Sequence, residues 1–600
     1  MIDAVILAEF DISSGNIIRL QYPRELEGVD PEDIAPMMIP DGAHNTEHDI
    51  TTFILRRNQK ENVEEEKDAN NLSDIKILSN RNFREPKINL LKHTGITLQK
   101  SPVRSLSDSP DSHKDRFREK QGEISDYVES INSNNDTYFF VSVLRNKRDL
   151  SYARGSIVKA MSIASKYRYV EAFNGLLDRA LNDYLDAFRV GEDQSDSEEK
   201  AEAIMGELYQ RINEECNISR FNKANFFEKR VYNDIRAYCD DKNRSKLSSF
   251  YYSKNIEWNG SSVRVKLPKA LDCDKLSNCT NLKSFVLKFG ERVMLIFNNI
   301  LLEKRVMFIG NKHSSKVMSE YVYTCLEMFT PPMIGLLYRA LPFITLNSIN
   351  LLQIPGYIAG TNNVLFETKT AYYDLACEIE SSKIKISREG EEDDFIHPDD
   401  ESHHECDLNF IRRLINRIKT KAIYDYEIKD YFASYLQTLL DLALSSDPVS
   451  DYPHNKVLQE FADQNSRRIS LFKKTSLFRI YKNIQNFMGY EVRSGISMFK
   501  LEENVRRLRF SASMSEELLR SIFMDFKEFL TPADHDRIIR FLYLFPRHKG
   551  GLSVLASAIF GQDEQVVKYA KECLEVLDDH PVGKKYIGQL SFVVQNKFRE

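Results

Sequence analysis

The residues with the most obvious capacity for chemistry are histidines and a cysteine in the second half of the chain. His403, His404 and Cys406 lie close together, and His397 precedes them. Such side chains are ordinary zinc ligands, but no second pair of ligands stands at zinc-finger spacing. They follow an acidic run at 389–394, which is typical of a solvated loop. We therefore expect no metal site here.

The sequence also gives little support for a site of acid, base or nucleophilic catalysis. The run Asp272-Cys273-Asp274 is more typical of a helix start than of an acid/base pair. The sequence contains no G-x-x-x-x-G-K-[ST] phosphate loop, no G-x-S-x-G nucleophile elbow, no H-E-x-x-H zinc motif and no dinucleotide-binding glycine motif. We expect no catalytic residue and no cofactor. A hydrolase with an unrecognised site stays open as a minor alternative.

The first elements of the chain predict a small α/β domain. Residues 4–22 contain two apolar runs around the turn Ser13-Ser14-Gly15, which is typical of a β-hairpin. The later strand candidates share β-branched and aromatic residues: 51–57, 137–144 and 156–164. Apolar residues at helical spacing across 170–188 predict a long helix that covers the sheet. An acidic loop at 191–200 and a short helix at 204–212 are expected to follow.

The middle of the chain alternates helical and strand patterns. The helix candidates are 283–297 and 314–329. The strand candidates are 306–309, which is apolar on both sides, and the shorter 340–346, 356–360 and 364–366. This alternation predicts a doubly wound α/β sheet. Beyond about residue 408, the patterns are helical throughout.

The length of 600 residues predicts two to four domains. The expected boundaries are a first α/β domain at 1–212, a connector at 213–262, a central α/β domain at 263–386, an acidic loop at 387–407 and an all-helical domain at 408–600. Residues 58–136 have few apolar side chains and predict a disordered insertion in the first domain. Ser101, Ser105 and Ser109 in this insertion are candidate phosphorylation sites, although unmodified solvated serines are an equal alternative.

Composition and charge restrict the class of protein. A formal net charge of −6 argues against nucleic-acid binding by the chain as a whole. The eight cysteines are scattered without a C-x-x-C spacing and no signal peptide opens the chain, which predicts a cytoplasmic protein. No run approaches the roughly 18 apolar residues of a membrane span. Peripheral membrane contact stays open, with recruitment to the plasma membrane or to vesicles. A basic stretch from 467 to 474 could touch acidic lipid, although a solvated helix face is the more ordinary reading. The oligomeric state is undetermined.

Three segments carry a resemblance to a known family. The first is AVILAEFDISSGNIIRLQYP with the later PDGAH, the second is ILLEKRVMFIG with LPFITLNSINLLQIPGYIAGTNN, and the third is a helical tail that closes in GKKYIGQLS. Together they resemble the tripartite DENN module, in particular its fungal Arf-interacting, polarity-axis-stabilising branch. Their order and spacing carry the resemblance, which covers nearly the whole chain apart from 58–136 and the connectors.

The resemblance implies a longin-like first domain, a wound α/β core and a helical third domain. It also implies a small-GTPase regulator or docking factor in vesicle traffic and polarised growth. Many DENN modules are guanine-nucleotide exchange factors for Rab proteins, whereas the polarity branch is associated with docking of Arf-type GTPases. Exchange of this kind needs no acid or base, because differential affinity for two GTPase states does the work. The alternative is a non-catalytic scaffold whose disordered insertion is the main interaction surface.

We expect the GTPase-facing surface where the longin-like and DENN-like sheets meet. The candidate residues lie in three loops: Asp41 and His44 in PDGAH, Asn311 and Lys312 after the strand at 306–309, and Tyr357, Thr361, Asn362 and Asn363 in the loop at 357–363. Ordinary loop structure is an equally good reading of each.

Overall fold

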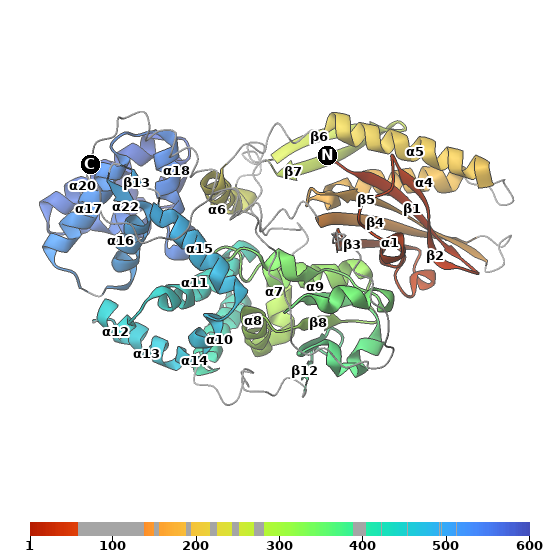
Figure 1. Cartoon of the computed structure of the whole chain (residues 1–600). Coiled ribbons are helices and arrows are strands. Elements are labelled where there is room, and N and C mark those ends of the chain that lie inside the picture. The colour runs from red at the N-terminus through yellow and green to blue at the C-terminus, as the bar shows by residue number, and fades with distance from the viewer. Residues whose placement is uncertain are drawn as a thin grey trace, which may run out of the picture. The chain divides into compact units, whose positions relative to one another are not determined.

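The computed structural model describes most of the chain outside the polar insertion (Figure 1). The described residues are 1–57, 137–148, 155–187, 194–216, 225–242, 251–268, 281–387, 404–421, 423–452, 454–490, 492–493, 495–511 and 513–599. The predicted disordered insertion, Ser101, Ser105, Ser109, the run at 272–274 and the acidic loop around 389–394 lie outside these residues.

The fold begins with a five-stranded antiparallel sheet in the order β2-β1-β5-β4-β3. The strands are β1 (Ala4–Asp11), β2 (Gly15–Tyr22), β3 (His48–Arg56), β4 (Thr137–Arg148) and β5 (Ser156–Ser165). All five were predicted from sequence, and the turn at Gly15, whose φ is +79°, closes the expected hairpin.

Helices cover both faces of this sheet. Val5 and Leu7 share a core with helix α4 (Asn174–Ala187). Ala4 and Ile6 belong to a second core, which includes residues of helix α1 (Pro31–Met38). The alternation follows from the two-residue period of a strand. The predicted helix at 170–188 is confirmed as α4 preceded by a 3-10 turn, Val170–Phe173.

Helix α5 corrects the predicted loop at 191–200. It runs from Gln194 to Glu215, so its first turns lie in the acidic stretch that we expected to be a loop. Ala201, Met205, Leu208 and Ile212 are buried at helical spacing, and the helix packs on β1 and β2. Glu, Ala and Lys are good helix formers, so an acidic composition alone does not indicate a loop.

The expected connector at 213–262 contains regular structure that packs in two directions. Helix α6 (Phe226–Lys242) shares a core with the C-terminal helices. The hairpin of β6 (Tyr251–Trp258) and β7 (Ser261–Pro268) shares a core with α4 and α5 instead. The Trp258 Nε1–H donates to Asp183 of α4 at 2.6 Å. Position 263, the expected start of the central domain, lies within this hairpin.

The central sheet has the order β12-β11-β8-β10-β9. Its strands are β8 (Val306–Ile309), β9 (Ala340–Leu341), β10 (Ile358–Thr361), β11 (Leu375–Glu378) and β12 (Ile384–Ile386). All neighbours are parallel except β11 and β12. The helices α7 (Leu282–Phe289), α8 (Val293–Leu301) and α9 (Ser315–Leu326) share a core with one face. Residues of short 3-10 helices cover the other face.

Three local predictions in this region need correction. The expected helix at 283–297 breaks at Gly290, whose φ of +59° ends α7. The strand expected at 340–346 is paired only over Ala340–Leu341. The run at 364–366 is a 3-10 helix, Val364–Thr368, because the Asn363 side chain accepts from the Leu365 N–H at 3.0 Å and starts a helical turn.

The C-terminal region is helical, as predicted. Its α-helices are α10 (His404–Thr420), α11 (Asp425–Leu444), α12 (Pro448–Asp451), α13 (Lys456–Gln464), α14 (Ser466–Phe472), α15 (Ser476–Tyr490), α16 (Met498–Phe510), α17 (Glu516–Leu530), α18 (His535–Tyr543), α19 (Ser553–Ala556), α20 (Glu564–Asp579), α21 (Gly583–Ile587) and α22 (Phe592–Arg599). A two-residue hairpin, β13 (Val492–Arg493) with β14 (Ile496–Ser497), interrupts them. None of the helices in the described ranges has the length and apolar character needed to cross a bilayer.

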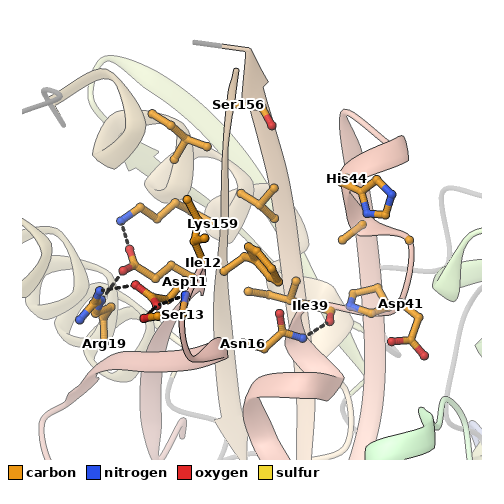
Figure 2. A pocket seen from close by; sticks show the side chains of 17 residues that line it. Asp11, Ile12, Ser13, Asn16, Arg19, Ile39, Asp41, His44, Ser156 and Lys159 are labelled. Atoms are coloured by element: carbon orange, nitrogen blue, oxygen red, sulfur yellow. Dashed lines mark hydrogen bonds and ion pairs between the residues drawn. The ribbon is translucent and has the colours of Figure 1, made fainter. Parts of the chain in front are cut away.

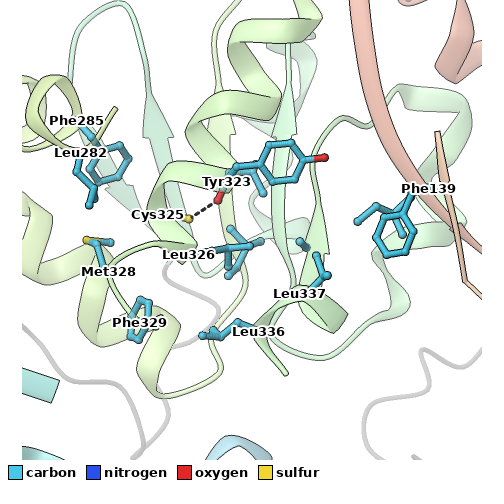
Figure 3. Close-up of a cluster of buried hydrophobic side chains, with 14 of the residues drawn as sticks. Phe139, Leu282, Phe285, Tyr323, Cys325, Leu326, Met328, Phe329, Leu336 and Leu337 are labelled. Carbon is cyan, nitrogen blue, oxygen red and sulfur yellow. Dashed lines mark hydrogen bonds between the residues drawn. The ribbon is translucent and has the colours of Figure 1, made fainter. Parts of the chain in front are cut away.

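These helices divide between two cores. Buried residues of α10, α11, α13 and α14 join the core that also contains α4 and α7 to α9. Figure 3 shows part of that core, with Leu282 and Phe285 of α7 near Cys325 and Leu326 of α9. The helices α16 to α22, together with α6, form the other core. Helix α15 contributes to both, with Tyr481 in one and Ile484 in the other.

Candidate functional site

The first and central sheets meet through helix α9, which packs on the edge strand β3. The Ser315 N–H at the start of α9 donates to Asp49 Oδ2 at 3.0 Å. One turn later, the Ser319 hydroxyl donates to the Thr52 carbonyl at 3.2 Å. Covering an edge strand with a helix satisfies backbone groups that would otherwise be open to pairing. The contact therefore gives the two sheets a defined junction.

A second set of contacts extends the junction toward the PDGAH loop. The 3-10 segment Leu346–Gln353 packs on α1. The Ser348 hydroxyl donates to Met37 Sδ at 3.1 Å, and Asn350 Nδ2 donates to Asp33 Oδ1 at 3.0 Å. These contacts join the segment before β10 to the helix before PDGAH.

The structure brings together three of the predicted site residues. Asn363 Nδ2 donates to Asp41 Oδ2 at 2.9 Å, and Asn362 Nδ2 donates to the Asp41 carbonyl at 3.4 Å. Asp41 and His44 are exposed, and the two asparagines are half-buried. We call this contact the Asp41–Asn363 bridge. It holds the PDGAH loop against the loop after β10.

The other central-domain candidates divide by accessibility. Tyr357 and Thr361 are buried, so a docked protein cannot contact them in this conformation. Asn311 and Lys312 are exposed, and the Lys312 N–H donates to Glu380 Oε1 at 2.9 Å. The Gly310 N–H donates to the Thr361 carbonyl at 3.1 Å, so the loops after β8 and β10 leave the same edge of the sheet. Carboxyl edges of parallel strands are common binding positions.

A groove of about 620 Å³ adjoins the PDGAH loop (Figure 2). It is surrounded by the tip of the β1–β2 hairpin, the PDGAH loop and the first residues of strand β5. Its lining residues are Glu9–Ser13, Asn16, Arg19, Ile39–His44 and Ser156–Lys159. The Asn16 side chain donates to the Ile39 carbonyl at 2.8 Å and ties the hairpin to the loop. The predicted residues Asp41 and His44 both line the groove.

Charge in the groove is largely paired within it. Glu9 accepts from both Arg19 and Lys159. Hydrogen bonds from the Ser13 hydroxyl and from the backbone N–H groups of Ser14 and Ser13 lower the pKa of Asp11 to about 2. Asp11 is therefore ionised at any physiological pH, at the mouth of the groove.

Four exposed apolar side chains flank the two bridging residues in sequence, two before Asp41 and two directly after Asn363. Phe10 and Ile12 of the hairpin are 36% and 59% exposed, and Val364 and Leu365 are 40% and 52% exposed. Sequence reasoning missed these four residues. The available signal was Ile12, an apolar residue between Asp11 and Ser13 in a polar turn. Exposed apolar groups with a polar rim are typical of protein-interaction surfaces.

Within the described ranges, no group of three histidine, cysteine or acidic side chains is placed to hold a metal ion. Cys406, the cysteine of the histidine and cysteine group noted in the sequence, donates through Sγ to Gln464 Oε1 at 2.6 Å. Burial raises the pKa of the Cys325 and Cys377 thiols, which keeps them protonated at neutral pH.

Two family descriptions match segments of this chain. "Afi1: Docking domain of Afi1 for Arf3 in vesicle trafficking" matches residues 4–152, and "SPA: Stabilization of polarity axis" matches residues 279–388. A protein of Schizosaccharomyces pombe described as AFI1-like is 20% identical, over 99% of this chain and 96% of the relative.

These matches support the resemblance to the Arf-interacting, polarity-axis branch.

The two matched segments correspond to the two sides of the junction. The docking-domain match includes β1 to β4 and the PDGAH loop. The polarity-axis match begins before α7 and ends after β12, so it contains the whole central sheet. The Asp41–Asn363 bridge therefore joins one matched segment to the other.

Proposed function

We propose that this protein is a docking factor for an Arf-type small GTPase in vesicle traffic and polarised growth. One observation carries the proposal. The segment that matches an Arf3-docking domain supplies most of the lining of the groove, including its exposed Phe10 and Ile12. Apolar side chains at the centre of a docking surface usually supply most of the binding free energy.

We further propose that the two sheets and the C-terminal helices act together as a DENN-type module. The proposal rests on the resemblance of the ordered segments and on the junction between the two α/β parts. In such a module, the bridge loops and the loop at Asn311 and Lys312 present one surface to the GTPase. Nucleotide exchange on a Rab-type partner is the finer form of this function, and it requires weaker affinity for the nucleotide-bound state than for the empty state.

The test is equilibrium binding of the full chain to purified Arf-type and Rab-type GTPases, each loaded with GDP or a non-hydrolysable GTP analogue. The double substitution Phe10→Ser and Ile12→Ser removes exposed apolar groups without opening a core. We expect the affinity for the Arf-type partner to fall by about tenfold or more. Release of labelled nucleotide, measured in the same samples, separates exchange from docking.

The matched control is Val457→Ser, because Val457 is 78% exposed on α13 and lies outside the groove lining. It should bind the GTPase as the unaltered chain does. Equal affinities for the double variant and the unaltered chain would refute the groove as the docking surface. Loss of binding only when residues 59–135 are deleted would favour the scaffold alternative.

A further inference from the structure

One stretch of the C-terminal region is strongly basic, although the chain as a whole is acidic. From residue 464 to residue 490 the sequence contains six Lys or Arg residues and no Asp or Glu. The formal net charge of the whole chain is −6. This stretch forms helices α14 and α15 and the turn between them.

The structure separates one of the six cations from the rest. Arg468 is buried and donates to Asp407 Oδ1 at 2.8 Å, so it belongs to the core. The other five are exposed: Arg467, Lys473, Lys474, Arg479 and Lys482. We call these five the α14–α15 basic face. The sequence alone could not distinguish the buried cation from the exposed ones.

The apolar side chains of the two helices are committed to the cores. Ile469 and Phe472 of α14 and Leu477, Phe478 and Ile484 of α15 are buried. The exposed positions of α15 are Ser476, Arg479, Lys482, Asn483 and Asn486, which recur at helical spacing. The surface is therefore polar and cationic without an apolar wedge that could enter a bilayer.

One acidic side chain already forms hydrogen bonds with the start of α15. Glu303 accepts from the Ser476 N–H at 3.1 Å, from the Leu477 N–H at 3.0 Å and from the Ser476 hydroxyl. It thus caps the N-terminus of α15 from the end of α8. The capping position is filled by a carboxylate, so an anionic partner would meet the exposed cations on the helix flank rather than the helix end.

We infer that the α14–α15 basic face binds an anionic membrane surface by electrostatic attraction. Lys and Arg side chains within a Debye length of acidic headgroups each contribute favourably to binding, and several together give measurable recruitment. The buried apolar side chains mean that contact stays at the headgroup level. This surface is separate from the groove at the β1–β2 hairpin, so the inference does not depend on the proposed GTPase docking.

The test is sedimentation of the full chain with vesicles, without any GTPase present. Vesicles of phosphatidylcholine alone are compared with vesicles that contain phosphatidylserine and a phosphoinositide, at low and at physiological salt. We expect binding to the anionic vesicles only, weakened by salt. The triple substitution of Lys473, Lys474 and Lys482 to Ala should lower the partition coefficient by about tenfold or more.

The matched control replaces Lys568, Lys571 and Lys584 with Ala, which changes the net charge equally on α20 and α21. It should retain vesicle binding. Equal losses in the two triple variants would overturn the inference, as would equal binding to neutral vesicles or an absence of binding at low salt. Binding of single-stranded RNA or an acidic peptide, without binding to anionic vesicles, would overturn it as well.

Discussion

Arg468 shows how far the environment of one residue can depart from its local sequence. The preceding residue, Arg467, is an exposed cation, yet the Arg468 guanidinium lies in the core between helices. It donates to Asp407 Oδ1 and Asn298 Oδ1, each at 2.8 Å, and to the Tyr435 hydroxyl at 2.9 Å. A buried ion pair of this kind tolerates the loss of one partner poorly, because the other charge is left without compensation.

At the residue scale, we predict that Asp407→Ala lowers the free energy of unfolding by about 3–5 kcal/mol. The matched comparison is Glu291→Ala, because Glu291 pairs with Arg412 on the surface at 2.6 Å. That loss should stay within about 1 kcal/mol. Urea unfolding followed by circular dichroism measures both. Similar losses in the two variants would show that Arg468 is not the buried charge that we describe.

The loop that leads into β10 is the element most dependent on close backbone approach. Gly356 has a φ of +58°, and a Cβ built on it would lie 2.4 Å from the Glu303 carbonyl oxygen. Buried Arg339 holds this loop in place: its Nε donates to the Gly356 carbonyl at 2.5 Å, and its Nη1 donates to the Ile300 carbonyl at 2.8 Å. The IPGYIAG motif is therefore a packing device that places β10 next to β8.

At the element scale, we predict that Gly356→Ala destabilises the protein by about 2–4 kcal/mol, because overpacking adds to the strain of a positive φ. Gly15→Ala is the control, since Gly15 has a φ of +79° but nothing within 4 Å of an added Cβ. It should cost only about 1 kcal/mol. Thermal unfolding ranks the two, and an equal shift would mean that the close approach at Gly356 is relieved without cost.

At the scale of the whole molecule, the segment that we expected to be a connector contributes to two different cores. Its helix α6 packs among the C-terminal helices, whereas its hairpin packs on the first domain. The Arg547 backbone N–H donates to Asp234 of α6 at 3.2 Å, and Arg547 Nη2 donates to Asp430 of α11 at 3.1 Å. Burial raises the pKa of Asp430 to about 7, against the opposing effect of Arg547.

At the scale of the whole molecule, we predict a pH dependence of stability from Asp430. Its folded-state pKa lies above its ordinary value of 3.8. Between about pH 4 and pH 7, the folded protein holds a proton that the unfolded chain has lost, so the stability from this group decreases as the pH rises. Asp430→Asn should flatten the dependence of the unfolding midpoint on pH over this window.

Asp11→Asn supplies the comparison for that measurement. The lowered pKa of Asp11 contributes stability above pH 4 that is lost only as the pH falls toward 2. Its replacement should leave the slope between pH 4 and pH 7 unchanged. A slope that survives in Asp430→Asn would assign the pH dependence to another buried carboxyl, with Asp234 as the first candidate because burial also raises its pKa.

Part of the candidate site could be predicted from sequence, and part could not. The resemblance pointed to PDGAH and to the loop at 357–363, and the structure brings Asp41 to Asn362 and Asn363. Burial removed Tyr357 and Thr361 from the accessible set. The exposure of Phe10 and Leu365 was invisible, because an apolar residue in a sequence is ordinarily assigned to a core.

Sequence by itself determined the strands of the first sheet, the helical character beyond residue 408 and the order of the elements. These features depend on side-chain period and turn residues within a few positions, so neighbouring residues encode them. Tertiary structure alone decided that Arg468 is buried while Lys473 is exposed, and that the expected connector divides between two cores. Those outcomes depend on contacts between residues far apart in the chain, whose free energies no local pattern contains.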